Sequence, residues 1–360
     1  MRKDFSPAWD GLARLAQRTG DEAKALEFFG KALEANPADA RARLHRGQLH
    51  LGAGRLDQAV LDITEAARLR PEDPEVQLGL AEVRLRARML DESLAAARRA
   101  AALTPRDPRV PALTAEIFLA MDALSESAEA AQAALTLDPG QPRALLALGE
   151  ALGRQGKLPE ALAALTPPDP AALAAEELAD FRDAKARWQL RLEEQRRLEG
   201  EAARDDAPSE TLLQLAEIRL AVSDFSAAAD LASRAASHGL EGAALRRAAV
   251  ILGQAGRLTE AERLLSGLTA GSEATADDWV NLGVLRELTG APGLAGEAYR
   301  RALELPKAPA DAHAGLARLA LARGDRKEAA AALRAYLDSN PPLEYTARTK
   351  EALSRLEEAK

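Results

Sequence analysis

The chain repeats itself every 34 residues. A proline recurs at this interval in four successive segments, at Pro37, Pro71, Pro105 and Pro139. The segments that these prolines close align without an insertion over residues 6–39, 40–73, 74–107 and 108–141. A fixed period of this size is the sequence signature of a repeat array, in which small units stack in a row and each contacts its neighbours. At 360 residues the chain also exceeds the usual size of a single compact core.

Each unit reads as two helices joined by a tight turn. In residues 40–73, a first apolar pattern of helical period ends at the turn GAGRL, and a second such pattern follows it. Gly54 permits the turn, and Pro71 ends the second helix because proline cannot donate the backbone hydrogen bond. Asp73 and Pro74 then supply an N-cap and a first helical residue for the next unit. The pattern predicts a series of helix-turn-helix hairpins.

Small residues recur inside both helices of each unit. The first helix carries one at Ala13, Gly47, Ala81, Ala115 and Gly149. The second helix carries one at Ala25, Ala59, Ser93, Ser127 and Ala161, and a further one at Ala32, Ala66, Ala100 and Ala134. Helices that lack bulk at facing positions approach closely, so we interpret these residues as packing positions.

With these residues the sequence resembles the tetratricopeptide repeat family. The first unit matches the family pattern at Trp9, Leu12, Ala13, Ala25, Phe29, Ala32 and Pro37. The unit that begins at Ala276 matches it at Trp279, Leu282, Gly283, Gly290, Ala295, Tyr299 and Ala302. Other residues replace the usual aromatic of the first helix at Ala16, His50, Arg84 and Leu152. The resemblance implies an all-α, right-handed superhelical solenoid of about nine hairpins.

The pattern divides the chain into two arrays separated by an insert. The N-terminal array covers residues 1–165, with units at 6–39, 40–73, 74–107, 108–141 and 142–165. The C-terminal array covers residues 209–343, with units at 209–241, 242–275, 276–309 and 310–343. A helix that caps the second array is expected at residues 344–360.

The insert at residues 166–208 admits two interpretations. Its length, close to two repeat periods together with the preceding unit, suits a degenerate hairpin. The absence of a turn signal before Gly200 instead favours one long helix over about residues 171–204.

Composition excludes several classes of function. A net charge of −8 gives no overall attraction to nucleic acid or anionic lipid. No apolar run reaches the length of a membrane span, so we expect a soluble protein of the cytoplasm or the periplasm. The absence of cysteine excludes disulfides and thiolate sites. The four histidines have no spacing typical of a metal site or a catalytic group, so we expect neither cofactor nor metal and no enzyme activity.

The surface is the remaining place for function. In the family that the chain resembles, the first helices line an inner face that receives an extended peptide or a partner helix. By position, the candidate residues are Arg41, Leu44, Gln48, Leu78, Glu82, Arg109, Glu116, Arg143, Leu146, Glu150 and Glu217. They form an apolar row and an acidic row, which together predict a partner with apolar and basic side chains. The alternative is that these charges pair between neighbouring repeats, where each exposed pair contributes about 0 to 1 kcal/mol.

The resulting hypothesis is a non-enzymatic scaffold or adaptor that binds protein on this face. A self-assembling structural protein is one alternative, because the ends of a solenoid can pair between chains. The repeat portion of a larger enzyme or of a membrane-associated assembly factor is another. The family's carboxylate clamp, which holds an acidic peptide end with Lys and Asn, is disfavoured because the equivalent positions carry Glu, Gln, Leu or His.

Overall fold

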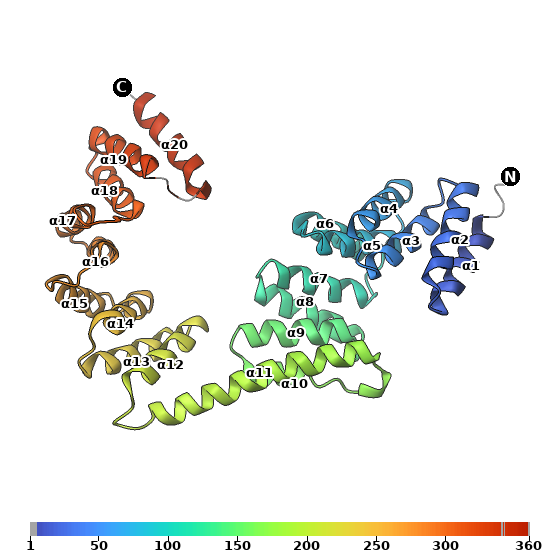
Figure 1. Cartoon of the computed structure of the whole chain (residues 1–360), viewed down its shortest axis with the longest axis horizontal. Helices are drawn as coiled ribbons and strands as arrows, with labels where there is room; N and C mark the ends of the chain where they lie inside the picture. The colour runs from blue at the N-terminus through green and yellow to red at the C-terminus, as the bar shows by residue number, and fades with distance from the viewer. Residues whose placement is uncertain (1–5, 340, 342, 359–360) are drawn as a thin grey trace. The chain divides into compact units, whose positions relative to one another are not determined.

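The computed structural model describes residues 6–339, 341 and 343–358. Over these residues the chain is helical and contains no strand. It divides into two compact units, unit 1 ending at Leu192 and unit 2 beginning at Glu193. Figure 1 shows the helices of each unit following one another as successive pairs. The predicted all-α repeat fold is therefore confirmed. None of the described helices combines the length and the apolar character that crossing a membrane requires.

Unit 1 contains five helix pairs and the start of a longer helix. The pairs are α1 (Ser6–Arg18) with α2 (Glu22–Ala35), α3 (Ala40–Gly52) with α4 (Leu56–Leu69), α5 (Pro74–Arg86) with α6 (Leu90–Leu103), α7 (Arg109–Ala120) with α8 (Leu124–Leu137), and α9 (Pro142–Arg154) with α10 (Leu158–Ala164). A short 3-10 turn, η2 (Pro170–Ala172), leads into α11 (Ala175–Ala202).

Unit 2 contains four further pairs and a last helix. The pairs are α12 (Ser209–Ala221) with α13 (Phe225–Ser237), α14 (Gly242–Gln254) with α15 (Leu258–Thr269), α16 (Ala276–Leu288) with α17 (Pro292–Leu303), and α18 (Ala310–Ala322) with α19 (Arg326–Asp338). The last helix, α20 (Leu343–Glu358), contacts α19.

The small residues pack the two helices of a hairpin against each other. In α6, the Ser93 hydroxyl donates a hydrogen bond of 2.6 Å to the carbonyl oxygen of Ala81 in α5. Ser127 and Ala115 make the same contact one repeat later, at 2.9 Å. A Cβ atom on Gly47 would lie 2.5 Å from the Ile63 side chain, which is closer than two carbon atoms can approach. Larger side chains at these positions would separate the helices.

The interhelical turns require a left-handed residue. Gly54 has a φ of +73° in the turn between α3 and α4, which glycine adopts without strain. The next two turns place Arg88 and Asp122 in the same conformation, with φ of 60° and 62°. Because a side chain makes this conformation unfavourable, the hairpin packing has to hold these two turns in place.

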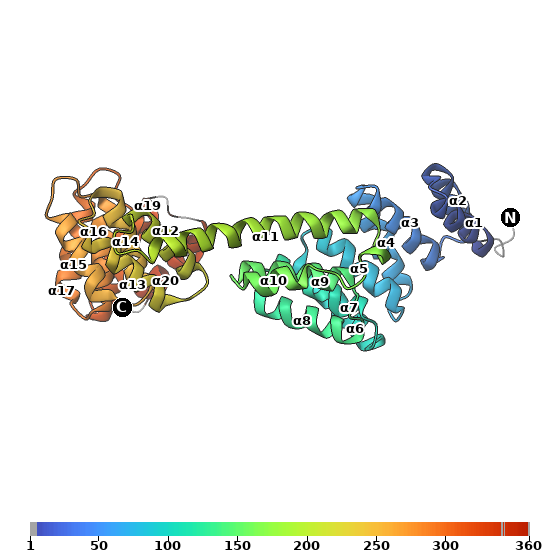
Figure 2. The same ribbon diagram turned by 90° about the horizontal axis from the view of Figure 1, so that it is seen from below.

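The insert forms one continuous helix. The sequence left open a long helix or a hairpin, and the structure has the 28-residue helix α11 (Figure 2). Its first part gives unit 1 the buried side chains Phe181, Ala184 and Trp188, which pack with leucines of α9 and α10. Its last part gives Leu198 and Ala202 to the core of unit 2. The helix therefore contributes side chains to both cores.

Candidate partner-binding surfaces

Ten of the eleven candidate residues lie in unit 1, on the first helices of its hairpins. We call the side chains that α1, α3, α5, α7 and α9 leave outside the core the first-helix face of unit 1. The remaining candidate, Glu217, lies on α12 of unit 2.

The acidic row of unit 1 is joined by one arginine. Arg143 on α9 donates hydrogen bonds of 2.7 and 3.1 Å to the carboxylate of Glu116 on α7, and one of 3.0 Å to Glu82 on α5. Burial lowers the pKa of the Arg143 guanidinium, but the two carboxylates outweigh it and raise that pKa. These contacts leave Glu82 and Glu116 with much of their charge compensated inside the protein.

Three other candidates also take part in ion pairs. Arg109 donates to Glu75, one repeat earlier, and also to Asp107, two residues before it. Glu150 lies 3.4 Å from the guanidinium of Arg187, which belongs to α11. In unit 2, Glu217 accepts a hydrogen bond of 2.8 Å from Arg247 on α14. Pairing between neighbouring repeats, the alternative that the sequence left open, is thus present at Arg109 and Glu217, whereas Glu150 pairs with the insert.

The predicted apolar row is packed into the protein. Leu44 is 4% exposed, and its Cδ1 atom lies 2.6 Å from the place where Gly79 of the next repeat would carry a Cβ. Leu78 packs against the same core cluster as Leu44. Leu146 packs against the cluster that contains Phe181 and Trp188 of α11. Leu44 is thus buried under the neighbouring repeat, whereas Leu78 and Leu146 are half-buried and keep part of their side chains at the surface.

Two candidates keep free polar groups beside pockets. A pocket of about 330 Å³ across α1, α3 and α5 is lined by Arg41 and Gln48, together with Arg14, Leu44, His45, Asp73, Glu75 and Val76. A second pocket, of about 700 Å³, is lined by Gln48 and by Leu51, Gly52, Gly54, Leu56, Glu82, Arg86 and Glu176. Neither the Arg41 guanidinium nor the Gln48 amide has a side-chain partner among the described residues. Gln48 belongs to both pockets.

Unit 2 has a groove that the sequence analysis missed. It lies between the first helices α14 and α16, has a volume of about 240 Å³, and is lined mainly by apolar side chains. Val250 and Val284 stand on its two sides. Each lies at the repeat position that Gln48, Glu82, Glu116 and Glu150 occupy in unit 1, and the interval between the two valines is again 34 residues. The change from polar residues in unit 1 to valine in α14 and α16 is the sequence signal for this groove.

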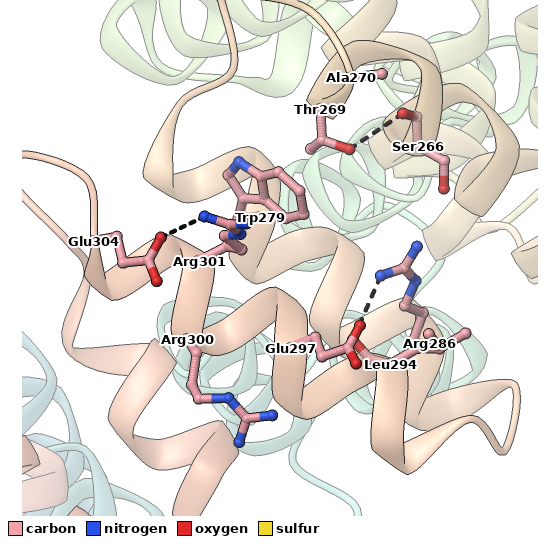
Figure 3. Close-up of a pocket in the computed structure, with 10 residues that line it drawn as sticks. All are labelled: Ser266, Thr269, Ala270, Trp279, Arg286, Leu294, Glu297, Arg300, Arg301 and Glu304. Atoms are coloured by element: carbon pink, nitrogen blue, oxygen red, sulfur yellow. Dashed lines mark hydrogen bonds and ion pairs between the residues drawn. The ribbon is translucent and has the colours of Figure 1, made fainter.

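A further pocket of unit 2, of about 540 Å³, lies between α15, α16 and α17 (Figure 3). Arg286, Arg300 and Arg301 reach it, and so do Glu297 and Glu304. Arg301 is paired with Glu304 at 2.7 Å, and Arg286 donates to the carbonyl oxygen of Leu294 at 3.4 Å. Charges of both signs line this pocket, so its electrostatics favour neither an anion nor a cation.

His45 and His50 contact neighbouring polar side chains. His45 Nδ1 lies 2.8 Å from Asp10, and His50 Nδ1 accepts a hydrogen bond of 3.0 Å from Arg55. Burial is the main cause that lowers the pKa of His50 and also of His313. Over the described residues, no three His, Asp or Glu side chains are grouped so that they could hold a metal ion.

Family models identify the repeats. One model described as tetratricopeptide repeat matches residues 47–108, 114–166 and 314–358, and a second matches residues 16–61. The chain belongs to the tetratricopeptide repeat family. Tetratricopeptide repeats are generally non-catalytic modules that bind other proteins, so the coarse prediction of a protein-interaction scaffold is supported. A search of curated proteins gives no match.

Solved structures similar to the chain include other tetratricopeptide repeat proteins. A thermophilic one from Thermus thermophilus is 22% identical, with a TM-score of 0.43 over 51% of this chain and 99% of that one. MamA from Desulfovibrio magneticus is 19% identical, with a TM-score of 0.40 over 51% and 96%. A tetratricopeptide repeat protein from Parabacteroides merdae is 12% identical, with a TM-score of 0.39 over 88% of this chain and 99% of that one. At these identities no function is carried over.

Proposed function

We propose that the protein is a non-enzymatic scaffold that binds an extended polypeptide segment on the first-helix face of unit 1. One observation carries this proposal: two pockets meet at Gln48, and Arg41 beside them has a guanidinium without an intramolecular partner among the described residues. An extended backbone exposes N–H and C=O groups, and an amide side chain can pair with both kinds. The pockets thus offer polar contacts along such a segment.

The charges of the face favour an acidic group in that segment. The sequence predicted a basic partner, on the assumption that Glu82 and Glu116 present free carboxylates. Both now accept hydrogen bonds from Arg143, whereas Arg41 is exposed and unpaired within the described part of the chain. A charge-assisted hydrogen bond to Arg41 is therefore a new contact available on this face.

Selection from a library of random peptides tests this proposal. We expect the protein to enrich peptides that contain Asp or Glu, and we expect Arg41→Glu to weaken their binding about tenfold. Arg98→Glu is the matched control, because Arg98 is an exposed and unpaired arginine on α6 outside both pockets, within the described part of the chain. Equal binding by Arg41→Glu and Arg98→Glu, or no enrichment above an unrelated protein, would refute the proposal.

A further inference from the structure

The groove between α14 and α16 displays apolar side chains on its rim. Val250 is 40% exposed, Val284 37% and Leu288 64%. The floor is formed by the buried side chains of Ala249, Leu265 and Leu285. These residues form an apolar surface that continues from the core of unit 2 to solvent. A side chain that entered the groove would remove the rim residues from water.

Gly253 keeps the groove open. A Cβ atom on Gly253 would lie 3.4 Å from Leu285 Cδ2 in the floor, so even one methyl group would fill part of the space. The neighbouring rim residue on α14 is Val250. The absence of a side chain at Gly253 therefore leaves space in the groove for an apolar side chain of a partner.

Two side-chain amides stand beside the apolar rim. Gln254 on α14 and Asn281 on α16 both line the groove and are exposed. In the described part of the chain neither amide has a hydrogen-bond partner. Each amide supplies donors and an acceptor, which an extended backbone can satisfy. A helical partner has its own backbone groups already paired along most of its length, so the amides favour an extended segment.

One free carboxylate lies on the same side of α16. Asp277 is exposed, and it has no ion pair with any residue that the structure describes. It precedes Asn281 by four residues and Val284 by seven, so all three share one face of the helix. Arg247 is the basic residue of α14 that is nearest in sequence to Val250. It already donates hydrogen bonds to Glu210 and Glu217. The charge left without a partner beside the groove is thus negative.

We propose that this groove binds an extended segment with one apolar anchor and one basic residue. The anchor, a Leu, Ile or Met, enters between Val250 and Val284, and the Lys or Arg pairs with Asp277. Seven helical residues separate Asp277 from Val284, which is about 10 Å at 1.5 Å per residue. An extended chain spans that distance in about three residues. The segment therefore has its basic residue and its anchor three positions apart. This surface is separate from the one proposed on unit 1.

The test is a peptide selection on the full chain and on its variants. The wild type is expected to enrich peptides with Lys or Arg three positions from Leu, Ile or Met. Val284→Glu places a carboxylate on the apolar rim, and it is expected to weaken the binding of these peptides at least about tenfold. Asp277→Lys is expected to remove the preference for the basic residue and to keep the preference for the apolar one.

Leu61→Glu is the matched control, since Leu61 is a 71% exposed leucine on α4 of unit 1. It should bind the selected peptides as the wild type does, and so should Arg41→Glu of the first proposal. Circular dichroism must show unchanged melting of Val284→Glu before its binding is compared. Enriched peptides without the basic and apolar pair would overturn the proposal, and so would equal binding by Val284→Glu. A dimer in sedimentation that Val284→Glu abolishes would overturn it too, because a second copy would then occupy the groove.

Discussion

Arg143 on α9 and Glu116 on α7 are joined by two hydrogen bonds across neighbouring repeats, at 2.7 and 3.1 Å. The same guanidinium reaches Glu82, which lies one repeat further back. A single cation therefore connects three successive first helices. The contact belongs to the stacking of hairpins, and it also decides which charges the first-helix face offers to a partner.

Loss of this cation should destabilise unit 1. We expect Arg143→Met to lower the free energy of unfolding by about 1 to 2 kcal/mol, because two carboxylates lose charge-assisted hydrogen bonds in a partly exposed site. Urea unfolding measures this change. Arg109→Met is the control: Arg109 and Glu75 are both about half exposed, so their pair should contribute less than about 0.5 kcal/mol. A smaller effect for Arg143→Met than for Arg109→Met would contradict the assignment.

A larger residue at a small packing position should separate the helices of a hairpin. Ala59 in α4 is fully buried, and Ala59→Leu is expected to cost about 1 to 3 kcal/mol through overpacking. Thermal unfolding measures the loss. Ala95→Leu, at an exposed position of α6, adds the same atoms without crowding and should leave the melting temperature nearly unchanged. Equal melting of both variants would show that Ala59 is not a packing position.

The hairpins and their packing positions could be predicted because each depends on residues within one repeat. Ala59, for example, recurs as Ser93 and Ser127 at the same interval, and the period alone marks it as a packing position. The candidate binding residues depend on contacts between repeats. Leu44 belongs by position to the expected binding face, yet it fills the space that Gly79 leaves in the next repeat. No pattern within a single repeat indicates such a contact.

The surroundings of the insert and the groove of unit 2 also depend on contacts between helices of different repeats, which the pattern within one repeat does not indicate. Leu146 is half-buried because α11 packs its aromatic side chains against α9 and α10, and the sequence left the conformation of that segment open. Val250 and Val284 continue the row of Gln48, Glu82, Glu116 and Glu150. Within unit 2 that position is apolar only in α14 and α16, so comparing these two helices with the others would have indicated an apolar surface between them.

Two glycines with different surroundings should respond oppositely to alanine. A Cβ atom on Gly153 in α9 would meet the Trp188 ring at less than contact distance, so Gly153→Ala must displace that ring and should cost about 1 to 3 kcal/mol. Gly30 lies within α2 with nothing near its Cβ position, and Gly30→Ala should stabilise the helix by about 0.5 to 1 kcal/mol. Chemical unfolding gives both values. Stabilisation by Gly153→Ala would show that Trp188 does not pack on Gly153.

Stability should depend on pH through Glu287. Its carboxylate accepts a 2.9 Å hydrogen bond from the Tyr299 hydroxyl and bonds of 3.0 and 3.1 Å from Arg318. Burial raises the pKa of Glu287, but these hydrogen bonds outweigh it and hold the pKa below its usual 4.5. A carboxylate with a lowered pKa stabilises the folded state above its unfolded pKa, and that contribution is lost as pH falls through the folded pKa.

We therefore expect Glu287→Gln to be less stable than the wild type at pH 7, and we expect the difference to shrink as the pH falls below about 4. The difference shrinks because protonated Glu287 no longer carries the negative charge that pairs with Arg318. Urea unfolding at a series of pH values measures it. Glu304→Gln is the control: Glu304 is 62% exposed and, among the described residues, its side chain bonds only Arg301, three residues before it. A difference for Glu287→Gln that stays constant down to about pH 3 would show that folding does not lower the pKa of this carboxylate.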